Sequence, residues 1–112
     1  IEADGVHLPE RETARAAAIR AAHPDWIVTA AWHGESAPPA GPDALVLSPV
    51  FPAGGASAAR PPLGAAAFRE RAQRTDAPVY ALGGATASNA IELADSGACG
   101  LAGVSAIQDA FA

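Results

Sequence analysis

Short apolar runs alternate along this chain with stretches in which alanine and charged residues recur at helical spacing. This pattern predicts strands at residues 6–8, 26–32, 43–51, 78–82 and 101–104, and helices at residues 10–22, 63–74, 86–96 and 105–111. The strand segments are continuously apolar, which is typical of strands buried on both faces. Repeated strand and helix units of this kind predict an α/β protein with a parallel sheet, either open or closed into a barrel.

Two features bear on which parallel fold forms. No Gly-x-Gly-x-x-Gly motif follows any strand, which disfavours an open sheet of the dinucleotide-binding type. Residues 33–42 contain Pro38, Pro39 and Pro42. Because proline disrupts helix interiors, the helix that should connect the second and third strands is expected to be very short or absent.

The composition narrows the class of protein. Half of the residues are hydrophobic and 17% are charged, which favours a single folded domain. The net charge of −5 disfavours a nucleic-acid binder, since such proteins need clustered positive charge. No run of about 18 apolar residues occurs, so no membrane span is expected and a cytoplasmic setting is the default. Cys99 is the single cysteine and the three histidines are not spaced as zinc ligands, so neither an internal disulfide nor a metal cluster is expected.

Residues suited to chemistry gather where the predicted strands end, at the edge where parallel α/β folds place their sites. Gly83 and Gly84 can present bare backbone N–H groups to an anion, and the helix expected after them adds the positive end of its dipole. Residues 104–106 offer the same arrangement one strand later. Together they predict the phosphate site that barrels build from the loops after their seventh and eighth strands.

Several segments carry a resemblance to a known family. In chain order they are ADGVHLP, VTAAWH, DALVLSPVFP, PLG, PVYALGG and GLAGVSAI, and they resemble successive blocks of the thiamine phosphate synthase/TenI family over nearly the whole chain. The resemblance implies a (β/α)8 TIM barrel, of which residues 1–112 form the C-terminal portion, roughly strands 4 to 8. It also implies that Gly83, Gly84, Val104 and Ser105 hold the phosphate of hydroxyethylthiazole phosphate. The implied transferase reaction joins this thiazole to hydroxymethylpyrimidine diphosphate, releases pyrophosphate and gives thiamine phosphate.

The chain departs from the synthase pattern at several positions. The Thr-x-Thr-Lys stretch that follows the FP motif in the synthases is absent, although Arg60 offers a positive charge there and Ser48 of SPVFP remains a candidate for substrate binding. The carboxylate that binds Mg²⁺ in the synthases corresponds to Glu12, or less directly to Glu10. Ala31 stands where the synthases carry a serine. The other diphosphate and metal groups of the family lie on strands that this sequence does not contain.

His33 directly follows the predicted strand 26–32, and its possible role is compatible with three functions. Some TenI-type proteins are thiazole tautomerases in which a histidine at the matching strand end moves the proton, and imidazole titrates near working pH. The alternatives are therefore a Mg²⁺-dependent synthase, an isomerase that uses His33 without a metal, and a non-catalytic protein that binds a phosphate ester. The synthase, as the commonest activity of the family, is our first expectation.

The sequence also predicts an incomplete barrel. The chain lacks methionine and begins at Ile1 inside an apparent strand, so we expect that upstream residues, or residues of one type such as a modified methionine, are missing from it. Five strands cannot close an eight-stranded barrel, and an open sheet edge invites pairing. We therefore expect either a longer parent protein or a homodimer.

Overall fold

The fold is built on one parallel sheet. The computed structural model describes residues 2–55 and 58–110. Its five strands are neighbours in chain order and all pairs are parallel. The strands are β1 (Gly5–Leu8), β2 (Ile27–Trp32), β3 (Ala44–Leu47), β4 (Val79–Leu82) and β5 (Ala98–Ala102). This order confirms the predicted α/β class with a parallel sheet.

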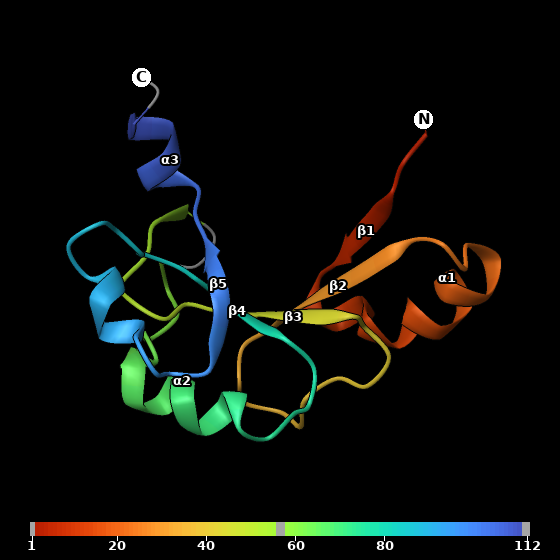
Figure 1. The fold of residues 1–112 in the computed structure, drawn as a ribbon, viewed down its shortest axis with the longest axis horizontal. Helices are drawn as coiled ribbons and strands as arrows, with labels where there is room; N and C mark the ends of the chain where they lie inside the picture. The colour runs from red at the N-terminus through yellow and green to blue at the C-terminus, as the bar shows by residue number, and fades with distance from the viewer. Residues whose placement is uncertain (1, 56–57, 111–112) are drawn as a thin grey trace.

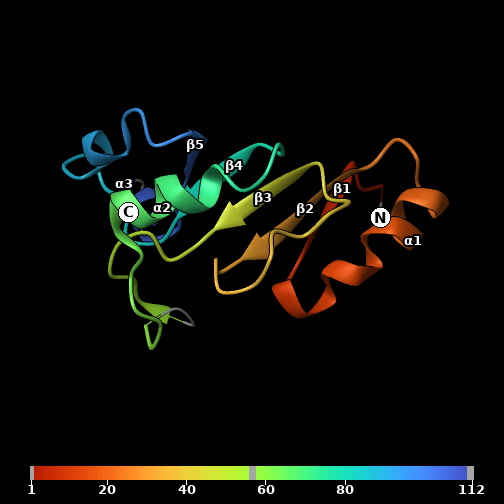
Figure 2. The ribbon, with the colours of Figure 1, turned by 90° about the horizontal axis from the view of Figure 1, so that it is seen from below.

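The helical segments lie between successive strands and pack mainly on one side of the sheet. The sheet is strongly curved, and α1 and α2 lie on its convex side, whereas α3 continues from the end of β5 (Figure 1, Figure 2). The helical segments are η1 (Glu10–Arg15), α1 (Ala16–Ala22), α2 (Gly64–Ala72), η3 (Ala90–Leu93) and α3 (Ser105–Ala110). Within the ranges that the structure describes, every helix is too short or too polar to cross a membrane.

The core lies between the sheet and the helices. Val28, Ala30 and Trp32 alternate along β2 and are completely buried, because every second side chain of a strand points to the same face. Phe68 of α2 is also completely buried and belongs to the same apolar cluster. This packing fixes the position of β2 and of the residues that follow it.

The opposite face of the sheet is partly open, so the expectation of strands buried on both faces is wrong for this chain. Ile27 of β2 is 60% exposed and Tyr80 of β4 is 37% exposed. Both side chains belong to the set that alternates with the buried residues. The reason is that α1 and α2 cover the convex side only (Figure 1).

Several predicted boundaries differ from the structure. The third strand ends at Leu47 rather than Phe51, and the fifth begins at Ala98 rather than Leu101. The first predicted helix, residues 10–22, begins as a 3₁₀ helix and becomes α-helical at Ala16. The register between β4 and β5 shifts between Val79 and Tyr80 of β4. The pairing at the start of β5, where the residues are small, is therefore irregular.

The helix predicted at residues 86–96 is reduced to the 3₁₀ helix η3 (Ala90–Leu93), and a side-chain-bonded turn precedes it. The N–H of Thr86 donates to Oδ1 of Asn89 at 2.8 Å, and the N–H of Asn89 donates to Oγ1 of Thr86 at 3.3 Å. The side-chain amide of Asn89 also donates to the carbonyl of Gly84 at 2.8 Å. These reciprocal bonds resemble those of a capping box, and the N–H of Ala90 donates to the carbonyl of Thr86 at 3.0 Å, but only the short η3 follows. The turn therefore ties the segment after β4 back to the glycine pair.

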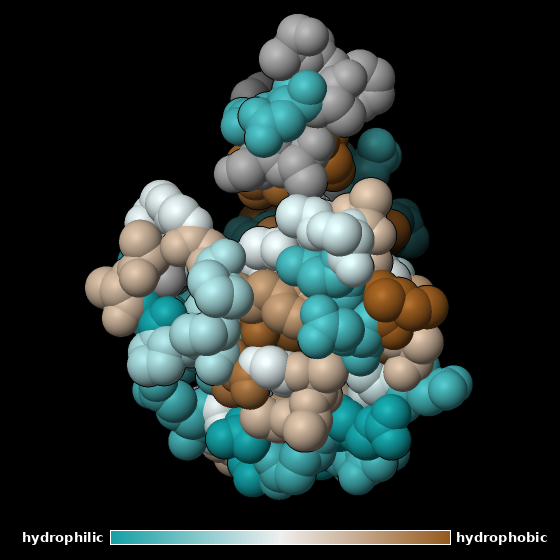
Figure 3. Space-filling model, turned by 90° about the vertical axis from the view of Figure 1, so that its left-hand side faces the viewer, coloured by the Kyte–Doolittle hydropathy of each residue, from teal (hydrophilic) through white to brown (hydrophobic). Residues whose placement is uncertain are grey.

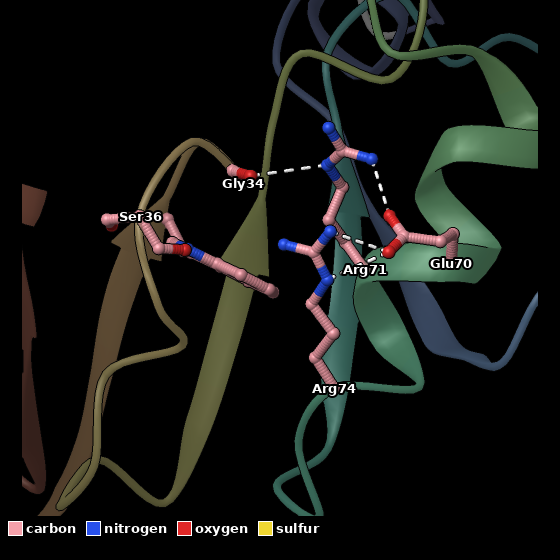
Figure 4. A network of polar contacts seen from close by, with 6 residues as sticks. Gly34, Ser36, Glu70, Arg71 and Arg74 are labelled. Atoms are coloured by element: carbon pink, nitrogen blue, oxygen red, sulfur yellow. Dashed lines mark hydrogen bonds and ion pairs between the residues drawn. The ribbon is translucent and has the colours of Figure 1, made fainter.

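Residues 33–42 form no helix, as their prolines predicted. This segment is instead held by side chains on either side of it (Figure 4). The indole N–H of Trp32 donates to the carbonyl of Ser36 at 3.1 Å, and Nε of Arg71 donates to the carbonyl of Gly34 at 3.2 Å. Arg71 is also paired with Glu70 on α2. These bonds fasten the loop after β2 to α2 where a crossover helix would otherwise lie.

Candidate functional site

A pocket of about 520 Å³ lies at the carboxyl ends of β4 and β5. Two loops, the end of one strand and one helix meet there: the loop after β3, the loop after β4, the end of β5 and α3. The lining residues are Pro52, Ala53, Gly54, Gly55, Leu82, Gly83, Gly84, Ala85, Thr86, Ala102, Gly103, Val104 and Asp109. The structure thus brings Gly83, Gly84 and Val104, which the sequence nominated as phosphate-binding residues, into one cavity.

The loop after β3 is fixed at both of its ends. On leaving the strand, it runs beside β4, where the N–H groups of Val50 and Phe51 donate to the carbonyls of Leu82 and Gly83, each at 3.0 Å. On its return, the N–H of Gly64 at the start of α2 donates to the carbonyl of Val50 at 2.8 Å. The Pro52–Gly55 wall of the pocket is therefore built on a closed loop that is bonded to the end of β4.

The two glycines after β4 are required by the backbone that passes over them. Gly83 and Gly84 have φ values of 106° and 66°, a region that side chains other than glycine rarely adopt. A Cβ atom on Gly84 would lie 2.2 Å from the carbonyl oxygen of Pro52, and one on Gly83 would lie 2.7 Å from Cα of Pro49. The glycine pair thus allows the loop after β3 to close against the end of β4.

An anion in this pocket would meet backbone groups rather than cationic side chains. Among its described lining residues, Asp109 is the one ionisable group, and no arginine or histidine is included. Arg60 is exposed and lies outside the lining, although it belongs to the same loop as Pro52. Val104 lines the pocket with 59% of its surface exposed. A phosphate here would be bound by backbone N–H groups, which can cradle an anion without net positive charge.

Ser105 is the first residue of α3, and its side chain lies outside the described part of the structure. Its predicted contact with a phosphate therefore stays a prediction. The backbone of α3 nevertheless brings this position to the end of β5, beside the pocket.

A second group of polar atoms lies at the carboxyl ends of β1, β2 and β3, outside the lining of this pocket. The backbone N–H of His33 donates to Oε2 of Glu10 at 2.5 Å. Nδ1 of His33 lies 2.9 Å from the carbonyl oxygen of Ser48. Because a carbonyl oxygen can only accept a hydrogen bond, Nδ1 is the donor, and in the neutral ring the lone pair is then on Nε2. This contact favours the tautomer that can accept a proton at Nε2.

The acidic residues at the start of η1 have different partners. Glu12 forms an exposed ion pair with Arg15 at 2.9 Å, and Glu10 bonds to His33 as described. In residues 2–55 and 58–110, no group of three or more histidine, cysteine, aspartate or glutamate side chains comes close enough to hold a metal ion. Mg²⁺ usually binds through one or two carboxylates and further oxygen ligands, so it does not require a cluster of this size.

The carboxylates with shifted pKa values serve the fold rather than the pocket. The backbone N–H of Val28 and the guanidinium of Arg20 hold the pKa of Asp43 below its usual value. Arg74, with help from Arg71, likewise lowers the pKa of Glu70 on α2. In both cases the hydrogen bonds favour the charged form of the acid.

Two parts of the site had no clear signal in the sequence. Asp109 faces the pocket only because α3 follows β5 closely, and its predicted helix carried no indication of that orientation. Glu10 reaches His33 across 23 positions in the chain, and only the pairing of β1 with β2 brings them together. Both contacts depend on tertiary structure.

The fold and the pocket define a class: a parallel α/β protein whose cavity lies at the carboxyl ends of its strands. The family model described as "Thiamine monophosphate synthase" matches residues 1–107, and the chain belongs to this family. The chain is 38% identical over 110 residues to a thiamine-phosphate synthase of Methanocella arvoryzae, with 95% of this chain and 52% of the relative covered. It is 36% identical over 115 residues to a thiamine-phosphate synthase of Bacillus velezensis, with 98% of this chain and 51% of the relative covered.

A solved structure gives the same fold. The thiamine phosphate pyrophosphorylase from Pyrococcus furiosus aligns with a TM-score of 0.71 and 31% identity, covering 91% of this chain and 49% of that protein. The five parallel strands are consistent with part of a TIM barrel. The chain spans about half the length of the relatives that it matches.

Proposed function

We propose that this chain carries the thiazole-phosphate-binding part of a thiamine phosphate synthase. The single observation that supports this most strongly is the pocket formed by Gly83, Gly84 and Val104 at the ends of β4 and β5. In the proposed reaction, the thiazole nitrogen attacks the methylene carbon of hydroxymethylpyrimidine diphosphate, a carbon–nitrogen bond forms and pyrophosphate leaves. The chain's own contribution is to bind and orient the thiazole phosphate through backbone N–H groups.

Other parts of the site would come from outside the chain. We propose that residues 1–112 are the C-terminal portion of the barrel, which agrees with a chain half as long as its relatives. Mg²⁺ is part of the synthase proposal, with Glu12 as one carboxylate ligand, while the remaining ligands and the diphosphate site belong to the missing strands. Ser48 and Arg60 remain proposed contacts to substrate, and the cytoplasmic setting remains part of the proposal.

The missing strands can be supplied in one of two ways: by the rest of a longer chain or by a second copy. The partly open face of the sheet and the exposed apolar residues near its C-terminal edge support the need for such a complement. Apolar surface is exposed between polar patches on the side of the molecule that Figure 3 shows. Among the described residues, the exposed fractions are 49% for Leu101 of β5, 59% for Val104, 52% for Ile107 of α3 and 75% for Ile91 of η3. Because the relatives are about twice as long, we propose the longer chain first and the homodimer as the alternative.

A second candidate function is isomerisation of a thiazole phosphate, and the geometry of His33 favours it. Nδ1 of His33 faces the carbonyl oxygen of Ser48, which leaves Nε2 as the proton acceptor. Such a tautomerase needs no metal. A protein that binds the phosphate ester without turning it over is the third alternative.

The binding step can be tested on this chain alone because the proposed phosphate pocket lies within it. We expect isothermal titration to show binding of hydroxyethylthiazole phosphate to the wild type and at least about tenfold weaker binding to Val104→Asp, since this variant adds a second carboxylate to the one that Asp109 already contributes to the pocket, and the added charge repels the phosphate. Ile91→Asp is the matched control, because Ile91 is also an exposed apolar residue but does not line the pocket. Equal binding by the two variants would contradict the assignment of the pocket.

Activity assays separate the candidate functions. The synthase proposal predicts Mg²⁺-dependent release of pyrophosphate when the complete protein is given both substrates. The isomerase proposal predicts turnover of a thiazole phosphate without Mg²⁺ and its loss in His33→Ala. Binding without either activity would support the third alternative, a protein that binds the phosphate ester without turning it over.

A further inference from the structure

Glu10 and His33 lie next to each other because their strands are paired. Leu8, the last residue of β1, pairs with Ala30 of β2, so the residues just beyond the two strands are neighbours. Glu10 lies two positions after Leu8, at the start of η1, and its carboxylate accepts the backbone N–H of His33. A charged acceptor makes a stronger hydrogen bond than a neutral one. This bond therefore fixes the main chain at the residue that bears the imidazole.

The ring of His33 has its own fixed partner on the other side. The carbonyl oxygen of Ser48 accepts from Nδ1, and the N–H of Ser48 donates to the carbonyl of Trp32 at 3.1 Å. Ser48 is 5% exposed, so its carbonyl is held in a buried and ordered position. In residues 2–55 and 58–110, no side chain or backbone group hydrogen-bonds to Nε2 of His33. Nδ1 is thus hydrogen-bonded, whereas Nε2 makes no hydrogen bond to the described residues.

We propose that Glu10 is a positioning residue for His33. By holding the backbone at the end of β2, Glu10 keeps the ring against the Ser48 carbonyl as the Nδ1-protonated tautomer, with Nε2 ready to accept a proton from a thiazole-phosphate ligand. Without this bond, the residue after β2 can rotate and the ring loses its single tautomer. The catalytic part of this inference rests on the proposed isomerase function, whereas the tautomer itself does not.

This role also distinguishes the two glutamates of η1. Glu10 already accepts a hydrogen bond from the protein, whereas Glu12 pairs only with the exposed Arg15 among the described residues. A carboxylate that fixes a neighbouring loop is constrained in position by that loop. We therefore assign positioning of His33 to Glu10 and leave the proposed metal contact to Glu12.

Long-range ¹H–¹⁵N NMR of the imidazole, recorded where the ring is neutral, tests the proposal directly. We expect wild-type His33 to show the Nδ1-protonated tautomer and Glu10→Ala to show a mixture of the two tautomers. Glu10→Gln keeps an acceptor oxygen and should retain the wild-type signature. Glu35→Ala is the matched control: it removes an exposed carboxylate two residues after His33 that makes no hydrogen bond to the His33 backbone.

The activity assay measures kcat and KM separately for each variant. We expect Glu10→Ala to lower kcat for thiazole-phosphate isomerisation about tenfold with KM little changed, because the base is misplaced while the phosphate pocket is intact. An Nε2-protonated ring in the wild type, or an unchanged tautomer in folded Glu10→Ala, would overturn the positioning role. If Glu10→Ala does not fold, an Nε2-protonated His33 in the wild-type or Glu10→Gln spectrum would still overturn the proposal. If the spectra show the predicted tautomers but the wild type does not turn over the thiazole phosphate, positioning by Glu10 is supported and the isomerase function is rejected.

Discussion

Replacing Gly84 by alanine tests how the pocket is built. The new Cβ would lie 2.2 Å from the carbonyl oxygen of Pro52 and 3.0 Å from Cβ of Phe51, and the residue would keep a φ of 66°. The carbonyl belongs to a backbone that is bonded to the end of β4, since Phe51 donates to Gly83. The substitution must therefore either displace the loop or strain both segments.

The two costs can be estimated separately. A left-handed backbone conformation costs an alanine about 1 to 2 kcal/mol relative to glycine. Overpacking against a fixed backbone costs about 1 to 3 kcal/mol more, so Gly84→Ala should lower the free energy of unfolding by about 2 to 5 kcal/mol. At roughly 4 °C per kcal/mol for a domain of this size, Tm should fall by about 8 °C or more.

Two other glycines of the same pocket serve as controls. Gly55 has a φ of 61°, and no residue that the structure describes lies within 4 Å of its added Cβ, so Gly55→Ala should show the backbone cost alone. Gly54 likewise has no described residue near its added Cβ and needs no left-handed conformation. Its replacement should be neutral or stabilise the protein by up to about 1 kcal/mol through the unfolded state.

Urea unfolding followed by circular dichroism measures all three variants. We expect stability to decrease in the order Gly54→Ala, Gly55→Ala, Gly84→Ala, and the thiazole phosphate to bind least well to Gly84→Ala. If Gly84→Ala were no less stable than Gly55→Ala, the close approach of Pro52 to the glycine pair would be refuted.

Two more predictions concern the scaffold. Phe68→Ala should lower the free energy of unfolding by about 3 to 5 kcal/mol in urea, because the completely buried ring would leave a cavity between α2 and the sheet, and Phe68→Leu should cost clearly less. The pKa of Asp43 is lowered in the folded protein by the Val28 N–H and by Arg20, so its stabilising effect is present above its unfolded pKa of about 3.8 and is lost as the pH falls through the lower folded value. Unfolding measured against pH should therefore show a stability gap between wild type and Asp43→Asn at neutral pH that closes in acid; a gap of constant size would contradict this linkage.

The parallel sheet and the edge that bears the pocket could be predicted from the residue pattern, whereas the strand order followed from the resemblance to a barrel family. Apolar runs separated by helical stretches leave a parallel sheet as the simplest solution, and its carboxyl edge then collects Gly83, Gly84 and Val104. The absence of a helix at residues 33–42 also followed from local chemistry, because the prolines there act within a few residues of the chain.

The errors arose where side chains or neighbouring segments decide the structure. Thr86 accepts the N–H of Asn89 as an N-cap would, but the helical segment after it is the 3₁₀ helix η3, which ends at Leu93 rather than continuing to Ser96. The contact between Glu10 and His33 depends on the register of β1 against β2, which no local pattern encodes. Sequence patterns therefore identified residues that line one pocket, whereas contacts such as that between Glu10 and His33 required the fold.

The measurement that tests the central claim most directly is a ¹H–¹⁵N NMR titration of the chain with hydroxyethylthiazole phosphate. The proposal predicts that the backbone amide signals of Gly83, Gly84 and Val104 shift together and saturate, while that of Ile91 stays in place. Saturable binding that leaves these three amides unchanged, or no binding by the folded chain, would contradict the assignment of this pocket to the thiazole phosphate.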